Sequence, residues 1–174
     1  SMHDKRRFAL RLLNVILGGN MSSRLFTEVR EKRGLAYYVG ASSTLYTDSG
    51  YAEITAGVPH DKVATTLDVI AGELRRLKRD GGTPEELKSA KEYVRGNTTI
   101  EMEDSSSLAS FFGEQALFRK EVLTPAELLK MMDKVSAGDI KKLANQLFVG
   151  AKANLAVVGY NQDKVAITNI LRQV

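Results

Sequence analysis

A helix-start pattern that occurs twice constrains the fold more than any other feature of the sequence. "TPEEL" begins at Thr83 and "TPAEL" begins at Thr124. In each, the threonine side chain can cap the helix, the proline suits the first helical position, and the following glutamate completes a capping box. "SAGDI" at Ser136 is a weaker version of the pattern. We therefore predict helices starting at these three points, and a second half of the chain that is mainly helical.

Apolar residues at helical spacing predict further helices on both sides of these starts. Two helices are expected near the N-terminus, over about 6–17 and 23–33, with Ser22 or Ser23 as the cap of the second. A long helix is expected over about 60–79, another over 105–121, and a closing helix over 160–174.

Two segments rich in Tyr, Val and Thr predict an antiparallel hairpin. They cover residues 35–47 and 51–58, and the turn "TDSG" lies between them. "ANLAVVG", residues 153–159, is expected to form a short buried strand. Three strands are few for so many helices, so we expect a strand preceding Arg6 to be missing from this chain and to leave an exposed sheet edge. The pattern favours an α+β fold, a small, mostly antiparallel sheet with helices packed on one face.

Length and composition suit one soluble domain. The chain has 174 residues, of which 43% are hydrophobic and 26% charged, and this is typical of a globular domain. We expect residues 6–174 to form a single domain and residues 1–5 to be a disordered head that includes a cloning remnant. A secretory cleavage site and an apolar run of about 20 residues are both absent from the sequence, which favours a cytoplasmic location.

Charge and residue types exclude several classes of function. The net charge of +4 is mild, and basic residues alternate with acidic ones, so neither a nucleic acid nor a membrane is expected as a partner. Cysteine is absent and the only histidines are His3 and His60. A disulfide, a transition-metal site or a histidine-dependent nucleophile is therefore not expected within this chain. The acidic pair Glu85–Glu86 lies at a predicted helix start, where carboxylates are favourable without any catalytic role.

The segment "GGNMSSRLFTEVREKRGLAYYVG", residues 18–40, carries the candidate site. Gly18 and Gly19 are expected to supply a left-handed cap for the first helix. A phosphate-binding loop is the weaker interpretation, because the sequence has no G-K-[ST] motif and the glycines follow a predicted helix instead of a strand.

Arg30 and Tyr37 are the candidate catalytic residues. Arg30 lies in the last turn of the second predicted helix, Gly34 can reverse the chain, and Tyr37 opens the hairpin. An arginine fork and a tyrosine hydroxyl suit a carbonyl that gains negative charge. The alternative is structural: Arg30 pairs with Glu28 or Glu31, and Tyr37 is a core aromatic.

The stretch "LNVILGGNMSSRLFTEVREKRGLAYYVGAS" resembles the signature of the C-terminal half of M16 zinc metallopeptidases, the pitrilysin/insulinase type. It is most similar to the mitochondrial-processing-peptidase-like branch. "YTDSGYAEITAGVP", "GGTPEELKSAKEYVRGN" and "NLAVVG" resemble further parts of that domain, and the resemblance covers about 6–159. Asn20 departs from the third glycine of many relatives. The implied fold is the M16 peptidase and LuxS-like metallohydrolase domain, which begins with a strand before the first helix.

The resemblance implies a divided active site. Proteins of this family have two homologous halves around a closed chamber, and the N-terminal half carries the zinc ligands in an H-x-x-E-H motif. The C-terminal half binds no metal and supplies an Arg and a Tyr seven residues apart. Arg30 and Tyr37 match these positions, so their implied role is to bind the substrate carbonyl and its oxyanion. Gly18 and Gly19 are expected to contribute to substrate binding.

The implied function is therefore that of the substrate-binding half of a zinc-dependent endopeptidase, inactive by itself. Zinc is implied in the N-terminal half of the parent protein, and no cofactor in this chain. The expected partners are that zinc-carrying domain, in the same or a partner chain, a peptide substrate, and a second copy in a homodimer. Two alternatives stay open: a non-catalytic M16-like scaffold subunit, and a free-standing peptide-binding module.

Overall fold

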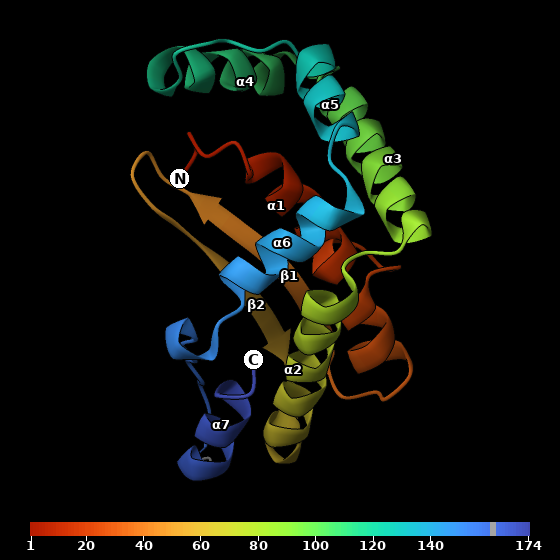
Figure 1. The fold of residues 1–174 in the computed structure, drawn as a ribbon, viewed down its shortest axis with the longest axis vertical. Coiled ribbons are helices and arrows are strands. Elements are labelled where there is room, and N and C mark those ends of the chain that lie inside the picture. The colour runs from red at the N-terminus through yellow and green to blue at the C-terminus, as the bar shows by residue number, and fades with distance from the viewer. Residues whose placement is uncertain (161–162) are drawn as a thin grey trace.

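A computed structural model describes residues 1–160 and 163–174 (Figure 1). Helices dominate it, and one hairpin supplies its two strands. In chain order the elements are α1 (Arg7–Asn14), η1 (Val15–Gly19), η2 (Phe26–Glu31), β1 (Tyr38–Leu45), β2 (Gly50–Gly57), η3 (His60–Lys62), α2 (Val63–Asp80), α3 (Pro84–Glu101), α4 (Ser105–Phe118), α5 (Pro125–Asp133), α6 (Ala137–Leu147), η4 (Gly150–Lys152) and α7 (Lys164–Leu171). η1 and η2 are π-helical, whereas η3 and η4 are 3-10 turns.

The hairpin confirms the α+β prediction. β1 and β2 pair antiparallel, with Val39 opposite Ala56 and Ala41 opposite Ile54. These four residues pack against or within the hydrophobic core. Because side chains alternate across a strand, the residues next to them along each strand, such as exposed Tyr38, lie on the opposite face. The helices therefore cover one face of a small antiparallel sheet.

The core lies where α1 packs between β1 and α6 (Figure 1). Its fully buried side chains come from segments far apart in sequence, including Leu12 and Leu13 of α1, Leu77 of α2 and Ile140 of α6. Met2 is also buried, and its backbone N–H donates to the carbonyl of Tyr46 at 2.8 Å. The first residues of the chain thus contact the hairpin turn.

The three predicted helix starts are confirmed. α3, α5 and α6 begin directly after Thr83, Thr124 and Ser136, and each start has a complete capping box. Asp139 takes the place of glutamate in the third box, and its carboxylate accepts the backbone N–H of Ser136 at 2.9 Å. A side chain one methylene shorter therefore suffices to close the box.

The strand predicted over 153–159 is wrong. These residues form no strand, and the side chains of Leu155, Val157 and Val158 are 39%, 43% and 104% exposed. A strand needs a neighbour that offers free backbone N–H and C=O groups. Among residues 1–160 and 163–174, β1 and β2 pair only with each other, so this apolar segment is not hydrogen-bonded into the sheet.

The left-handed glycine cap predicted after the first helix is also wrong. Gly18 has a φ of −160°, and Gly19 is not among the residues with positive φ. A Cβ on Gly18 would lie 2.4 Å from the backbone nitrogen of Ala41, so the absence of a side chain allows η1 to approach β1. The start of η2 has no side-chain cap from Ser22 or Ser23, and Ser23 Oγ instead donates to the carbonyl of Asn20 at 2.6 Å.

Gly18→Ala should destabilise the chain by about 1–3 kcal/mol, the usual cost of overpacking. The clash is with the backbone of Ala41, which cannot change rotamer to relieve it. Urea denaturation of the two proteins measures the effect. Gly113→Ala is the matched control, because a Cβ there meets nothing within 4 Å, and alanine favours a helix. Equal unfolding midpoints for Gly18→Ala and the wild type would contradict the packing argument.

Candidate functional site

Arg30 is held at the surface by a well-anchored helical turn. Leu25 and Val29 are 0% exposed and fix the inner side of this turn, whereas Arg30 is exposed. The backbone N–H of Gly34 donates to the carbonyl of Arg30 at 3.1 Å, and that of Leu35 donates to Val29 at 2.9 Å. Gly34 has a φ of 58°, a conformation that favours glycine, and there the chain turns back toward the hairpin.

Tyr37 lies at the start of the hairpin. Its backbone N–H donates to the carbonyl of Gly57 at 2.9 Å, and its side chain is 83% exposed. The Cζ atom of Arg30 is 5.9 Å from the centre of the Tyr37 ring. The two side chains are therefore neighbours at the surface, and the alternative that Tyr37 is a core aromatic is wrong.

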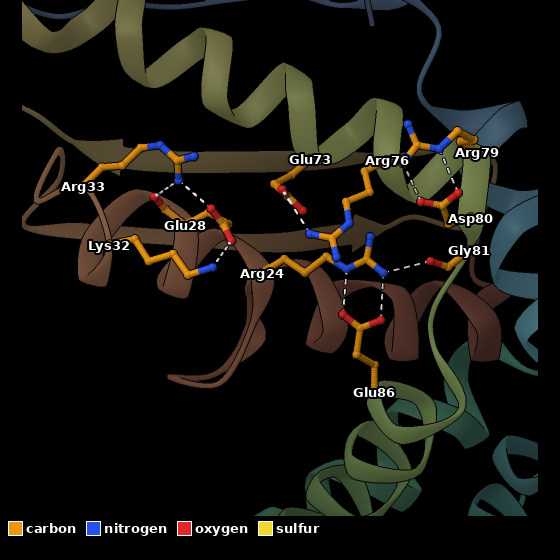
Figure 2. Close-up of polar contacts among 10 residues, drawn as sticks. All are labelled: Arg24, Glu28, Lys32, Arg33, Glu73, Arg76, Arg79, Asp80, Gly81 and Glu86. Carbon is orange, nitrogen blue, oxygen red and sulfur yellow. Dashed lines mark hydrogen bonds and ion pairs between the residues drawn. The ribbon is translucent and has the colours of Figure 1, made fainter.

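The glutamates near Arg30 do not pair with it. Glu28 instead binds Arg33 at 2.5 Å and Lys32 at 2.6 Å (Figure 2), and these hydrogen bonds lower the pKa of the Glu28 carboxyl. Within the described part of the chain, no ion pair involves Arg30. Positions one and two residues apart on a helix do not face each other, which explains why Glu28 and Glu31 leave this guanidinium available.

Phe26 lies beside Arg30 on the same helical turn and is half-buried. The Cζ atom of Arg30 is 4.8 Å from the centre of the Phe26 ring. Phe26 and Arg30 are four residues apart, a spacing that brings side chains together on a helix surface. That spacing is the signal by which the sequence could have revealed the contact.

A concave surface of about 530 Å³ adjoins Tyr37. Small residues dominate its lining, which consists of Gly34, Ala36, Tyr37, Gly57, Val58 and Pro59. Glycine and alanine allow the main chain of a ligand to come close to the protein surface. The site therefore combines an exposed cation, a phenol and a shallow depression lined by small residues.

Gly18 and Gly19 lie away from this depression. Gly18 packs against Gly40 and Ala41 of β1, further along the strand than Tyr37. The carbonyl of Gly19 accepts a hydrogen bond from the hydroxyl of Tyr93 at 3.3 Å. The contacts found in the described residues link neither glycine to Arg30 or Tyr37, so substrate binding by these glycines stays a prediction.

A buried ion pair ties the helical turn of Arg30 to the start of α3 (Figure 2). Arg24, 7% exposed, donates from Nε and Nη2 to the two carboxylate oxygens of Glu86, both at 2.7 Å. Its Nη2 also donates to the carbonyl of Gly81 at 2.8 Å. Glu86 closes the Thr83 capping box as well. One carboxylate thus joins two helix starts that are 62 residues apart.

Burial and pairing oppose each other in setting the pKa values of this pair. Burial lowers the pKa of Arg24, but the hydrogen bond and the charge of Glu86 raise it by more. The pKa of Arg24 is therefore raised above its ordinary value. Burial raises the pKa of Glu86, but Arg24 and the backbone of Thr83 lower it more. Both groups are therefore held in their charged forms.

The described residues do not fit a metal site. In residues 1–160 and 163–174, no cluster of three or more His, Cys, Asp or Glu side chains is placed to hold an ion. Zinc chemistry therefore finds no ligand set in this part of the chain. No described helix has both the length and the apolar character needed to cross a bilayer.

Comparisons with known proteins agree on the family. Residues 1–94 match the family model described as the peptidase M16 inactive domain. An uncharacterized zinc protease of Streptomyces coelicolor is 35% identical over 163 residues, which are 94% of this chain and 35% of that protein. The zinc protease YmxG of Bacillus subtilis, also uncharacterized, is 37% identical over 83% of this chain and 35% of its own length. The chain thus spans about a third of these relatives.

Solved structures agree on the fold. A protease from Helicobacter pylori superposes with a TM-score of 0.76 at 25% identity, over 85% of this chain and 36% of that one. A peptidase M16 inactive domain from Pseudomonas fluorescens gives 0.77 at 24% identity, over 84% and 35%. The sequence match and the shared α+β fold lead to one conclusion: this chain belongs to the peptidase M16 inactive domain family.

Proposed function

We propose that this chain is the substrate-binding half of a zinc-dependent endopeptidase. The observation that carries the proposal is the pairing of Arg30 and Tyr37. Both side chains are exposed, they lie 5.9 Å apart from guanidinium carbon to ring centre, and no carboxylate neutralises the guanidinium in the described structure. Two hydrogen-bond donors of this kind suit an oxygen atom that becomes negatively charged.

The role of these residues is to bind and orient the scissile carbonyl. Arg30 offers N–H donors in the plane of its guanidinium, and Tyr37, at the start of the hairpin, adds an O–H donor. Donors that are already in place stabilise the oxyanion without further rearrangement. The depression lined by Gly34, Ala36 and Gly57 gives the peptide main chain room to approach them. Metal chemistry belongs to the other half of the proposed enzyme.

The proposed partner is an N-terminal zinc-carrying M16 domain in the same or a partner chain. Relatives about three times longer than this chain carry the name zinc protease, which supports a second, metal-binding half. The proposed substrates are peptides or unfolded segments that enter a chamber between the halves. A homodimer of the parent protein is compatible with this arrangement.

A non-catalytic scaffold subunit is the second candidate function. The absence of a metal cluster from residues 1–160 and 163–174 is expected of either candidate, so it does not distinguish them. The unpaired Arg30 beside Tyr37 argues against it, because a scaffold has no need of two exposed donors at one spot.

Cleavage of a fluorogenic peptide library by the full-length protein and by the 174-residue chain tests the proposal. The full-length protein should hydrolyse peptides and lose this activity with a zinc chelator, whereas the chain alone should cleave none. Metal analysis should find no stoichiometric zinc in the chain alone. A full-length protein that retains zinc but cleaves no peptide would support the scaffold instead.

A further inference from the structure

Arg30 has no carboxylate beside it on the helix, but its guanidinium contacts an aromatic ring. The residues that face it on a helix surface lie three or four positions away, and these are Phe26, Thr27, Arg33 and Gly34. None is acidic. Its guanidinium carbon lies 4.8 Å from the centre of the Phe26 ring, so an aromatic face supplies its nearest support on the helix.

We propose that Phe26 is a positioning residue that holds the Arg30 guanidinium toward the substrate carbonyl. This inference rests on the proposed function of Arg30. A carboxylate partner would occupy the N–H donors that the carbonyl needs. An aromatic ring instead contacts the flat face of the guanidinium, which leaves the donors in its plane available. Phe26 therefore orients Arg30 without competing for its ligand.

Phe26 is itself well placed for this task. Its side chain is half-buried, and both Leu25 before it and Val29 after it are fully buried. These two side chains fix the backbone on both sides of Phe26, and its ring lies 4.8 Å from the guanidinium carbon of Arg30. The Tyr37 ring, 5.9 Å from the same Cζ atom, limits the movement of Arg30 from the hairpin side.

The other cations of this helix are kept away from the ring. Nη1 of Arg33 donates to the backbone carbonyl of Glu28 at 2.7 Å and to its carboxylate at 2.5 Å. Lys32 binds the second carboxylate oxygen of Glu28 at 2.6 Å. Glu28 thus engages Lys32 and Arg33, and Arg30 is the cation that contacts Phe26.

Kinetics of the full-length protein test this role. Phe26→Leu keeps an apolar side chain but removes the aromatic face, so kcat/KM should fall by about 2–5-fold, the fold-change expected for an exposed cation–π contact. Phe26→Tyr should restore most of the lost kcat/KM. In an Arg30→Ala background, Phe26→Leu should cause no further loss. Equal losses in both backgrounds would show a merely structural role and overturn the proposal.

Phe8→Leu is the matched control. The Cζ atom of Arg7 lies 4.3 Å from the Phe8 ring centre, so this variant removes an equivalent arginine–aromatic contact in α1, outside the site. Its kcat/KM should equal that of the wild type. A loss as large as that of Phe26→Leu would show that kcat/KM responds to any weakened arginine–ring contact, and would overturn the specific role of Phe26.

Relaxation of the Arg side-chain ¹⁵Nε nuclei in the 174-residue chain gives a measurement that does not depend on catalysis. The order parameter of Arg30 Nε should fall in Phe26→Leu and not in Phe26→Tyr, whereas that of Arg33 should not change. An unchanged Arg30 value would overturn the positioning role. If Arg30→Ala had normal kinetics in the full-length protein, the proposed function would fail even though Phe26 restrains Arg30.

Discussion

Arg30→Ala in the full-length protein should lower kcat/KM by about 10²–10³-fold, equivalent to about 3–4 kcal/mol of lost oxyanion stabilisation. Tyr37→Phe, which removes only the hydroxyl, should lower it in the same direction and by a similar or smaller factor. Both donors lie at the surface of this chain, so neither substitution removes a buried contact. Initial rates on one peptide across substrate concentrations separate the effects on kcat and KM.

Neighbouring residues provide the controls for these two variants. Arg33→Ala removes an exposed arginine that pairs with Glu28, and Tyr38→Phe removes the hydroxyl of the adjacent exposed tyrosine. Both should retain kcat/KM within about twofold, since surface changes outside a site have small effects. Wild-type kinetics in both Arg30→Ala and Tyr37→Phe would remove the assigned role.

Arg24→Met should have the largest effect on stability among the ion pairs. It preserves an apolar stem but leaves Glu86 without its bidentate partner, and the carbonyl of Gly81 without a donor. Breaking a buried pair costs about 3–5 kcal/mol. The Glu86 side chain is 30% exposed and can be hydrated in part, so we expect a loss of about 1–3 kcal/mol. Urea denaturation of this chain measures the free energy of unfolding.

Arg79→Met is the matched control, because its partner Asp80 is exposed and the Arg79 side chain is itself 73% exposed. Exposed pairs contribute little, so its unfolding midpoint should equal that of the wild type. If Arg24→Met behaved in the same way, the link between α3 and the helical turn of Arg30 would have no energetic importance.

The pH dependence of unfolding gives a second measure of the Arg24–Glu86 pair. The pKa of Glu86 in the folded chain is lowered from the ordinary 4.5. Its contribution to stability is therefore fully present above that value and is lost as pH falls through the lower folded pKa. Arg24→Met removes the main hydrogen bonds that lower this pKa, so the difference in stability between wild type and variant should shrink as pH falls below about 4.5.

Much of the candidate site could be predicted because its parts are close in sequence. Arg30 and Tyr37 are seven residues apart, and Gly34 lies between them with the positive φ that turns the chain. The helix starts at Thr83 and Thr124 were equally predictable, since each depends on a hydrogen bond across three residues. Phe26 was not singled out in the sequence, although its four-residue spacing from Arg30 predicts their contact.

Other features depend on segments that are distant in sequence. An apolar run such as 153–159 shows that a strand is favourable, but not whether the run will pair with another strand, and in the described residues it pairs with none. The role of Gly18 depends on its contact with Ala41, 23 positions later. In the sequence, nothing distinguishes Arg24 from the neighbouring cations. Its partner Glu86 is 62 residues away, and only the fold brings the two together.

The sequence by itself therefore determined the helix starts, the hairpin, the family resemblance and the position of Arg30 next to Tyr37. All of these follow from interactions within one turn, one hairpin or one short motif. Only the tertiary structure decided which arginine is buried and paired, and which is exposed with its donors available. Arg24 and Arg30 are six residues apart, and what distinguishes them is that Arg24 is buried against Glu86 at the start of α3, whereas Arg30 lies at the surface beside Phe26 and Tyr37.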